Sequence, residues 1–333
     1  MSMPVIESEQ QTTTNRFPIV SQLVVLGLIL VGAFGSLWFL QASQAEVDDE
    51  VIVTPSARTS AEHTIAPPPK LAAVALRADA AYVWDVAGQR ALYKKNEGEV
   101  LPIASITKLM TTMLAHELIA EQAQVGIPQA AIQQSGNSGL VAGEELTVEE
   151  LTQLALISSS NDAAFALGAS VGTLLGTRDP AQQFVAGMNI RANELQLPTL
   201  SFQNTTGLDV SASQAGGLGS ARDVSFLLEY MLVNYPELLA PTTQSSARVY
   251  NSGGEFHDFT NTNVIANQIP NLLASKTGYT DLAGGNLTIA FDLGLNRPII
   301  ITVLGSTRDA RFSDVLELVA AVQASVAEPT IYD

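Results

Sequence analysis

The order of strand-like and helix-like segments is the feature that most constrains the fold of this chain. Two strand patterns come early, at 80–85 and 90–93, with the turn residues Asp85-Val86-Ala87-Gly88 between them. Five more strand patterns come late, at 247–250, 255–259, 272–277, 286–291 and 298–304. Helical patterns fill the middle, and a last helix is expected over about 312–327. Segments from both ends of the chain must then share one sheet, which predicts a mixed α/β fold.

Helix-start signals mark the middle of the chain. Thr147-Val148-Glu149-Glu150 is a capping box and predicts a helix to about residue 157. Asp179-Pro180 supplies a cap and a proline at the first helical position, so a helix to about residue 195 is expected. The other helices expected there are 109–118, 163–171 and about 220–233. The middle of the chain is therefore predicted to be mainly helical.

The N-terminal region contains a long uncharged run. No charged residue occurs from Phe17 to Ala45, and the part from 19 to 40 is long enough to span a bilayer as a helix. Trp38 and Phe39 near its end suit a membrane interface. A signal peptide cleaved after Ala45 is the alternative, but the apolar run exceeds the usual ~7–15 residues of a signal core. We therefore expect an uncleaved transmembrane anchor.

This interpretation divides the chain into five parts. Residues 1–18 would be a cytoplasmic tail and 19–40 the transmembrane anchor or signal segment. A linker rich in Ser, Thr and Pro follows at 41–71. The folded domain is expected at 72–328, before a short tail at 329–333. The domain would lie outside the cytoplasm, held at the cell membrane by the single span, or secreted if the span is cleaved.

Composition excludes several classes of function. The net charge of -17 and the pI of about 4.4 argue against a nucleic-acid partner. The absence of cysteine removes disulfides and thiolate catalysis. The three histidines, His63, His116 and His257, have no metal-ligand spacing and no triad-like context. We expect no metal site and no Ser-His-Asp triad, so any catalysis would use other residues.

Ser105 and Lys108 form an S-x-x-K spacing directly before the apolar run 109–118. If Ser105 opens a helix there, the two side chains lie one turn apart on the same face. A serine hydroxyl needs a base to become a nucleophile, and a lysine whose pKa is lowered can be that base. The same spacing also suits an N-cap serine followed by an exposed lysine, so it decides nothing alone.

Two further motifs follow in order, Ser159-Ser160-Asn161 and Lys276-Thr277-Gly278. S-x-x-K, S-x-N and K-T-G in this order resemble the serine penicillin-recognising enzymes. More narrowly, the chain resembles the low-molecular-mass D-alanyl-D-alanine carboxypeptidases over roughly residues 72–326. The stretches that carry this resemblance are 104–111, 159–164, 202–209, 220–223, 261–263 and 276–280. It implies a β-lactamase/DD-peptidase-like α/β fold, with an antiparallel sheet flanked by helices and a mainly helical subdomain.

The resemblance also implies catalytic roles. Ser105 would be the nucleophile that forms an acyl-enzyme, and Lys108 its general base. Ser159 would relay a proton to the leaving amine. Asn161 would hold the substrate amide and position Lys108. Lys276 would supply positive charge that keeps Lys108 neutral.

Substrate-binding roles follow from the same resemblance. Thr277 and Gly278 would lie on the strand edge where the substrate peptide pairs. The backbone N–H groups of Tyr279 and of the nucleophile would form an oxyanion hole. Arg311 would face the terminal carboxylate of the substrate, and Arg308 is close enough in sequence to be its rival for that role.

The function implied is a serine-type D-Ala-D-Ala carboxypeptidase that trims peptidoglycan stem peptides and needs no cofactor or metal. Its partners would be stem peptides ending in D-Ala-D-Ala, with β-lactams as covalent inhibitors. A DD-endopeptidase would use the same residues. A β-lactamase would need a glutamate that activates water, for which Glu194 is the nearest candidate. A non-catalytic cell-wall-binding module is the alternative of another class.

Overall fold

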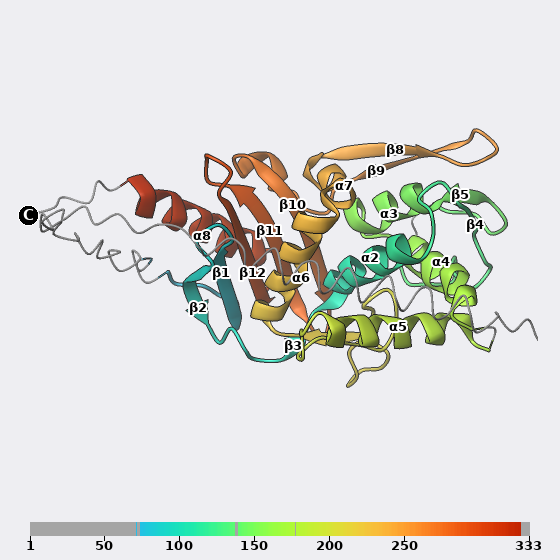
Figure 1. Cartoon of the computed structure of the whole chain (residues 1–333), viewed down its shortest axis with the longest axis horizontal. Coiled ribbons are helices and arrows are strands. Elements are labelled where there is room, and N and C mark those ends of the chain that lie inside the picture. The colour runs from blue at the N-terminus through green and yellow to red at the C-terminus, as the bar shows by residue number, and fades with distance from the viewer. Residues whose placement is uncertain (1–70, 72–73, 137–138, 177, 328–333) are drawn as a thin grey trace, which may run out of the picture. The chain divides into compact units, whose positions relative to one another are not determined.

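The computed structural model describes residues 71, 74–136, 139–176 and 178–327 (Figure 1). The expected cytoplasmic tail, the anchor at 19–40, almost all of the linker and the tail at 329–333 lie outside the described residues. Within the described ranges, no helix is both long enough and apolar enough to span a bilayer.

A five-stranded antiparallel sheet unites the two ends of the described chain. Its strands are β1 (Ala80–Asp85), β2 (Arg90–Lys95), β10 (Leu272–Thr280), β11 (Gly284–Asp292) and β12 (Pro298–Ser306). Their order is β10-β11-β12-β1-β2, so the early hairpin joins the late strands through β1 and β12. Ala80 lies opposite Leu304 in that pairing. The predicted sharing of one sheet by distant segments is confirmed.

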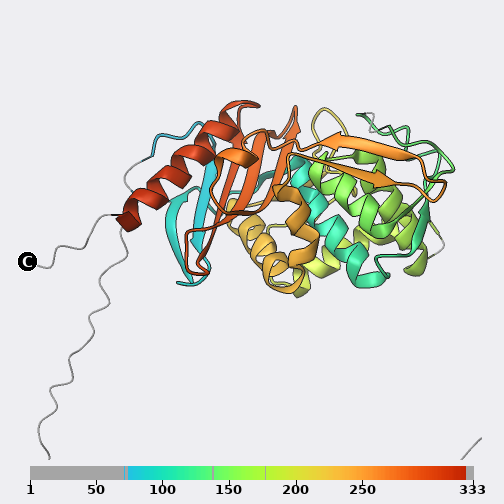
Figure 2. The same ribbon diagram turned by 90° about the horizontal axis from the view of Figure 1, so that it is seen from above.

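Helices cover both faces of this sheet and form a separate helical group. They are α2 (Lys108–Leu118), α3 (Val148–Ile157), α4 (Asn161–Val171), α5 (Pro180–Glu194), α6 (Ala221–Asn234), α7 (Pro236–Leu239) and α8 (Ala310–Ala327). Helices α2 to α5 gather beside the sheet (Figure 1), while α6 and α8 lie on its opposite faces (Figure 2). The α/β architecture with a mainly helical subdomain agrees with the prediction.

The sheet buries apolar residues on both faces because successive side chains of a strand point to opposite sides. On one face, Val83 and Ile301 pack with Val315 and Leu318 of α8. On the opposite face, Tyr82 and the other strand residues that point to that side join the larger core, which also contains residues of α2 and α6. The sheet is therefore a middle layer, and its edge strand β10 is left facing the helical group.

The predicted capping box at the start of α3 is present. Glu150 N donates to Thr147 Oγ1 at 3.1 Å, and Thr147 N donates back to Glu150 Oε2 at 2.7 Å. Asp179 caps α5 in the predicted way, accepting from Gln182 N at 3.4 Å. The helix α3 ends at Ile157, with Ser158 as its C-cap, directly before the S-x-N segment.

Several short elements were not expected from the sequence. A three-stranded sheet joins β3 (Leu101–Pro102), β7 (Gly217–Gly219) and β6 (Ser201–Phe202), and β4 (Gln124–Gly126) pairs with β5 (Glu145–Thr147). The 3₁₀ turns are η1 (Ala104–Thr107), η2 (Gly172–Leu174), η3 (Ala240–Thr243) and η4 (Ala266–Gln268). The expected late strands β8 (Ser246–Tyr250) and β9 (Phe256–Thr260) form a separate hairpin packed along α3 (Figure 1).

Candidate active site

Ser105 lies in the 3₁₀ turn η1 and does not open an α-helix as expected, since α2 begins at Lys108. Residues three apart are eclipsed in a 3₁₀ turn, whereas they are offset in an α-helix. The turn therefore brings Lys108 Nζ to 2.8 Å from Ser105 Oγ. The expected meeting of the two side chains occurs, but through a tighter turn than predicted.

Close backbone contacts hold this turn from two sides. Ala104 has a φ of +48°, a left-handed conformation that costs a residue with a Cβ about 1–2 kcal/mol. A Cβ on Gly207 would overlap the carbonyl oxygen of Ala104. A Cβ on Gly278 would lie 2.7 Å from the carbonyl oxygen of Ile103 and 3.3 Å from Ser105 N. Both glycines are thus needed for the loop at 207 and strand β10 to reach the turn.

Lys108 is fully buried and has three polar neighbours. Its Nζ lies 2.8 Å from Ser105 Oγ, 2.7 Å from Asn161 Oδ1 and 2.7 Å from Thr206 O. Burial, and then the charge of Lys276, hold the pKa of Lys108 well below its usual value. A neutral amine has two N–H groups and one lone pair. Because Asn161 Oδ1 and Thr206 O can only accept, the lone pair is left to face the Ser105 hydroxyl.

Lys276 is the second buried lysine of the site. Its Nζ donates to Ser159 Oγ at 2.9 Å and to Thr277 O at 3.0 Å. Burial first, and then the charge of Arg311, lower the pKa of Lys276 to about 7. Lys276 thus links the K-T-G strand to the S-x-N segment and places its charge near Lys108.

The S-x-N segment lies between α3 and α4. Ser159 has a φ of +62°, and Ser160 caps α4 by accepting from Ala163 N at 3.0 Å. Capping is therefore done by Ser160, which leaves Ser159 to contact Lys276. Asn161 is the first residue of α4, and its Nδ2 donates to Ser135 O at 2.6 Å while its Oδ1 contacts Lys108. The structure thus brings the three predicted motifs together.

Strand β10 presents the K-T-G residues at the sheet edge. Thr277 is buried, and its Oγ1 lies 2.6 Å from Thr262 Oγ1. Tyr279 is 42% exposed. Strand β10 is the edge strand of the five-stranded sheet, the position at which an extended peptide can pair, although Ser275 N is already bonded to Thr242 Oγ1 at 3.0 Å.

The two arginine candidates both lie at the end of this strand. Arg311 is buried, and its Nη1 donates to Gly278 O at 2.6 Å, while its Nε has no hydrogen-bond partner among the described residues. Arg308 lies over the ring of Tyr279, at 5.2 Å from its centroid. Burial, and then the charge of Arg308, lower the pKa of Arg311. The structure keeps both near the site, so the choice between them remains a prediction.

A polar cleft of about 350 Å³ lies along these residues. It is lined by Gly136, Ser158, Ser159, Ser160, Asn161, Asp258, Phe259, Thr260 and Thr262. One wall is the S-x-N segment and the other is strand β9 with the residues after it. That β9 would border the site could not be predicted from the sequence, because the residues of β9 form no motif.

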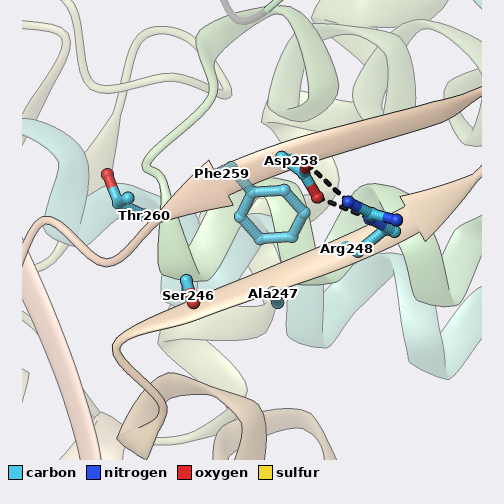
Figure 3. Close-up of a pocket in the computed structure, with 6 residues that line it drawn as sticks. All are labelled: Ser246, Ala247, Arg248, Asp258, Phe259 and Thr260. Carbon is cyan, nitrogen blue, oxygen red and sulfur yellow. Dashed lines mark hydrogen bonds and ion pairs between the residues drawn. The ribbon is translucent and has the colours of Figure 1, made fainter.

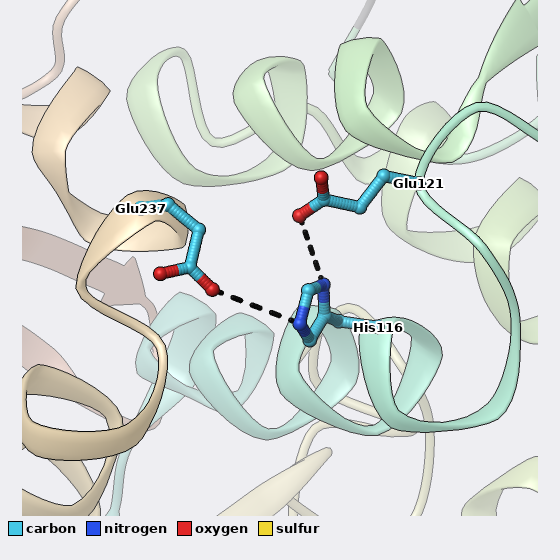
Figure 4. Close-up of side chains that lie close together, drawn as sticks. All are labelled: His116, Glu121 and Glu237. Carbon is cyan, nitrogen blue, oxygen red and sulfur yellow. Dashed lines mark ion pairs between the residues drawn. The ribbon is translucent and has the colours of Figure 1, made fainter.

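A histidine and two glutamates meet away from this cleft, at the end of α2 (Figure 4). His116 Nδ1 lies 3.0 Å from Glu121 Oε1, and His116 Nε2 lies 3.7 Å from Glu237 Oε1. One ligand atom from each residue could lie within 4.8 Å of the others. The sequence search found no ligand spacing here because the three residues come from separate segments. The imidazole lies between the two carboxylates, and only that of Glu237 belongs to α7.

The candidate nucleophile, base, second lysine and edge strand form an arrangement that can carry out acyl transfer. The matching family model is described as D-alanyl-D-alanine carboxypeptidase, peptidase S11, and it covers residues 63–308. A D-alanyl-D-alanine carboxypeptidase of Bacillus subtilis is 30% identical over 69% of this chain and 58% of its own length. A D-alanyl-D-alanine endopeptidase of Pseudomonas aeruginosa is 29% identical over 76% of this chain and 80% of its own.

Comparison with solved structures gives the same family. Penicillin-binding protein D2 of Listeria monocytogenes, in its ampicillin-bound form, superposes with a TM-score of 0.62 and 28% identity. That comparison covers 75% of this chain and 98% of the other. The matched region contains all three motifs and both lysines. The chain belongs to the peptidase S11 family of D-alanyl-D-alanine carboxypeptidases.

Proposed function

We propose that this chain removes the terminal D-alanine from peptidoglycan stem peptides as a serine-type carboxypeptidase. The observation that carries the proposal is the contact of 2.8 Å between Lys108 Nζ and Ser105 Oγ. Lys108 is buried, its pKa is lowered, and its other two neighbours accept hydrogen bonds. A lysine with these contacts and a lowered pKa is suited to act as the general base for Ser105.

The reaction would proceed through an acyl-enzyme. Ser105 Oγ attacks the carbonyl carbon of the penultimate D-alanine while its proton passes to Lys108. The C–N bond then breaks, and the leaving amine takes a proton through Ser159, which contacts Lys276. Water hydrolyses the ester on Ser105 and releases the shortened peptide. Backbone N–H groups of Ser105 and Tyr279 would stabilise the oxyanion in both steps.

Recognition of the substrate carboxylate would depend on local positive charge. The chain as a whole carries a net charge of -17. Lys276 and Arg311 nevertheless lie together behind strand β10, close enough for Arg311 to lower the pKa of Lys276. An anion bound at Thr277 would face this pair, which would raise the pKa of Lys276 again and keep it charged. β-Lactams, which acylate the same serine in such enzymes, are the proposed covalent inhibitors.

The proposed location is the outer face of the cytoplasmic membrane. The support is the uncharged run from Phe17 to Ala45, whose part at 19–40 is long enough to span a bilayer. Peptidoglycan lies outside that membrane, so a tether there would hold the catalytic domain beside its substrate.

The test is D-alanine release from diacetyl-L-Lys-D-Ala-D-Ala by the full-length chain in detergent. We expect release by the wild type, none by Ser105→Ala, and unchanged release by Ser252→Ala, an exposed serine on the hairpin turn. Absence of release from a folded wild type would refute the carboxypeptidase assignment. Equal release by wild type and Ser105→Ala would refute the proposed nucleophile.

Two alternatives make different predictions. A β-lactamase would hydrolyse penicillin rapidly and regenerate free enzyme. Glu194, the residue considered for its water-activating role, is 57% exposed and pairs with Arg191 at 3.0 Å. That pairing on the end of α5 gives no support for such a role. A non-catalytic wall-binding module would bind peptidoglycan equally well with Ser105 replaced.

A further inference from the structure

Glu144 is a buried carboxylate that ties the segment between β4 and β5 to the β8–β9 hairpin. We call this segment, residues 127–136 and 139–144, the β4–β5 connection. The side chain of Glu144 is 8% exposed. It accepts hydrogen bonds from Asn251 Nδ2 at 3.0 Å and from the backbone N–H of Val141, and His257 Nε2 lies 2.9 Å from it. Asn251 and His257 belong to the hairpin, so the carboxylate joins two segments.

These partners keep the carboxylate ionised. Burial would raise the pKa of Glu144, but the hydrogen bonds from Asn251, Val141 and His257 together hold this pKa below its usual value. An ionised carboxylate can only accept hydrogen bonds, so the proton of the contact with His257 lies on Nε2. A buried charge is costly unless it is paired in this way. Glu144 is therefore held firmly against the hairpin.

The hairpin is braced on its other face. Arg248 of β8 donates from Nε and Nη2 to the two carboxylate oxygens of Asp258 in β9, at 2.6 and 2.8 Å (Figure 3). Successive side chains of a strand point to opposite faces, so His257 lies on the face away from this ion pair. The exposed fractions of the side chains agree, at 58% for Asp258 and 14% for His257. The buried face of a cross-linked hairpin thus receives Glu144.

The same connection also contacts the catalytic residues. The backbone carbonyl of Ser135 accepts a hydrogen bond from Asn161 Nδ2 at 2.6 Å. An added Cβ on Gly136 would lie 3.4 Å from the same nitrogen, so the connection packs closely against this amide. A side-chain amide has its donor and its acceptor on different atoms, so the bond to Ser135 determines where Asn161 Oδ1 points. That oxygen lies 2.7 Å from Lys108 Nζ.

We propose that Glu144 is a positioning residue for the acylation of Ser105. By holding the connection on the hairpin, Glu144 fixes the Ser135 carbonyl that orients the amide of Asn161. Asn161 Oδ1 is one of the two acceptors that leave the lone pair of Lys108 facing the nucleophile. If the connection moves, an N–H group of the lysine can face the serine instead. The inference rests on the proposed function, because it concerns the same acyl-enzyme.

The experiment follows acylation by fluorescent penicillin with the full-length chain in detergent. Stopped-flow traces give the rate constant at saturating penicillin and the concentration that gives half of it. Gel analysis gives the fraction of chains that become labelled. A residue that only stabilises the fold would change the labelled fraction, because unfolded chains do not react. A positioning residue changes the rate constant of the folded chains.

Two substitutions at Glu144 and one at Asn251 test the contact. Glu144→Ala should lower the saturating rate constant about tenfold, because a displaced base is costly, with less than about a twofold change in the half-saturating concentration. Glu144→Gln keeps the shape of the side chain and still bonds the hairpin, so it should stay within about threefold of wild type. Asn251→Ala removes one donor and should slow acylation about threefold, which keeps the test usable if Glu144→Ala does not fold.

Asp85→Ala is the matched control. Asp85 is a fully buried carboxylate that also accepts from three donors, Gly88 N at 3.0 Å, Arg90 Nε at 3.4 Å and Arg297 Nη2 at 2.6 Å. It lies in β1, which β11 and β12 separate from the edge strand β10. Its loss should lower the resistance to urea and leave the acylation rate constant of the folded chains unchanged.

Several results would overturn the inference while leaving the proposed function in place. One is a wild-type rate constant in Glu144→Ala or, where that variant does not fold, in Asn251→Ala. Another is a smaller labelled fraction that reacts at the wild-type rate, which would show a purely structural role. Glu144→Gln as slow as Glu144→Ala, or an equal slowing by Asp85→Ala, would overturn it too. A folded wild type that penicillin does not label would refute the proposed function together with the inference.

Discussion

At the scale of residues, the site depends on two lysines that folding removes from water. Lys108 and Lys276 are both fully buried, and burial is the first cause of the lowered pKa of each. Their contacts differ in kind. Lys108 has the Ser105 hydroxyl and two pure acceptors, so it can act as a base. Lys276 has the Ser159 hydroxyl and a backbone carbonyl, so it is placed to donate and to supply charge.

The lowered pKa of Lys276 predicts a pH dependence of stability. The unfolded chain keeps this proton until about pH 10.4, whereas the folded chain loses it near pH 7. Between these values the unfolded state binds more protons, so this residue makes the free energy of unfolding rise with pH. The slope is at most about 1.4 kcal/mol per pH unit, and it vanishes below the folded pKa.

Urea unfolding at pH 6, 7, 8 and 9 checks this. The free energy of unfolding of wild type, minus that of Lys276→Met, should increase steeply from pH 7 to pH 9 and much less from pH 6 to pH 7. Lys94→Met replaces an exposed lysine of β2 and should show no such difference. A constant difference between wild type and Lys276→Met at all four values would show that Lys276 keeps its proton on folding.

At the scale of elements, the nucleophile depends on a turn held between a loop and a strand. Ala104 adopts its left-handed conformation where Gly207 and Gly278 press against the backbone of η1. The short sheet of β3, β7 and β6 fixes the chain just before the turn, with Leu101 paired to Gly219. The reactive geometry thus comes from backbone packing that three separate segments share.

Gly207→Ala should damage this turn. Gly207 has a φ of +77°, and an added Cβ would overlap the Ala104 carbonyl oxygen, so the turn must shift. We expect a loss of about 1–3 kcal/mol in stability, as for other overpacked sites. Acylation by penicillin should slow at least about tenfold, because small displacements of a nucleophile are costly. Stopped-flow acylation and urea unfolding measure the two effects.

Gly126→Ala is the control for this substitution. Gly126 has an ordinary φ, and an added Cβ would meet nothing within 4 Å. It should acylate at the wild-type rate. Wild-type acylation by Gly207→Ala would contradict the account of the turn.

At the scale of the whole molecule, the sequence predicted the features that depend on short motifs or on the order of motifs and elements along the chain. The alternation of elements predicted a sheet shared by both ends, and β1 does pair with β12. Three motifs in order predicted a common site, and Ser105, Lys108 and Asn161 do meet. These features are visible because they depend on residue types at fixed spacings.

Other parts of the site could not be predicted from the sequence. The carbonyl oxygen of Thr206 accepts a hydrogen bond from Lys108. Every residue has such a carbonyl, so nothing in the sequence distinguishes Thr206 as a neighbour of Lys108. The 3₁₀ turn at Ser105 follows from contacts with Gly207 and Gly278, which are distant in sequence. The wall of the catalytic cleft formed by β9 depends on how β8 and β9 pack against α3. Such features are set by tertiary packing, which overrides local patterns.

We propose that Ser105 becomes acylated and that the chain is held at the membrane. The most direct measurement is labelling of intact cells with fluorescent penicillin, followed by separation of membrane and soluble fractions and gel analysis. The account predicts a labelled band near 35.2 kDa in the membrane fraction, absent from a strain carrying Ser105→Ala at equal expression. A band of undiminished intensity in that strain, or no band with the wild type, would contradict the account.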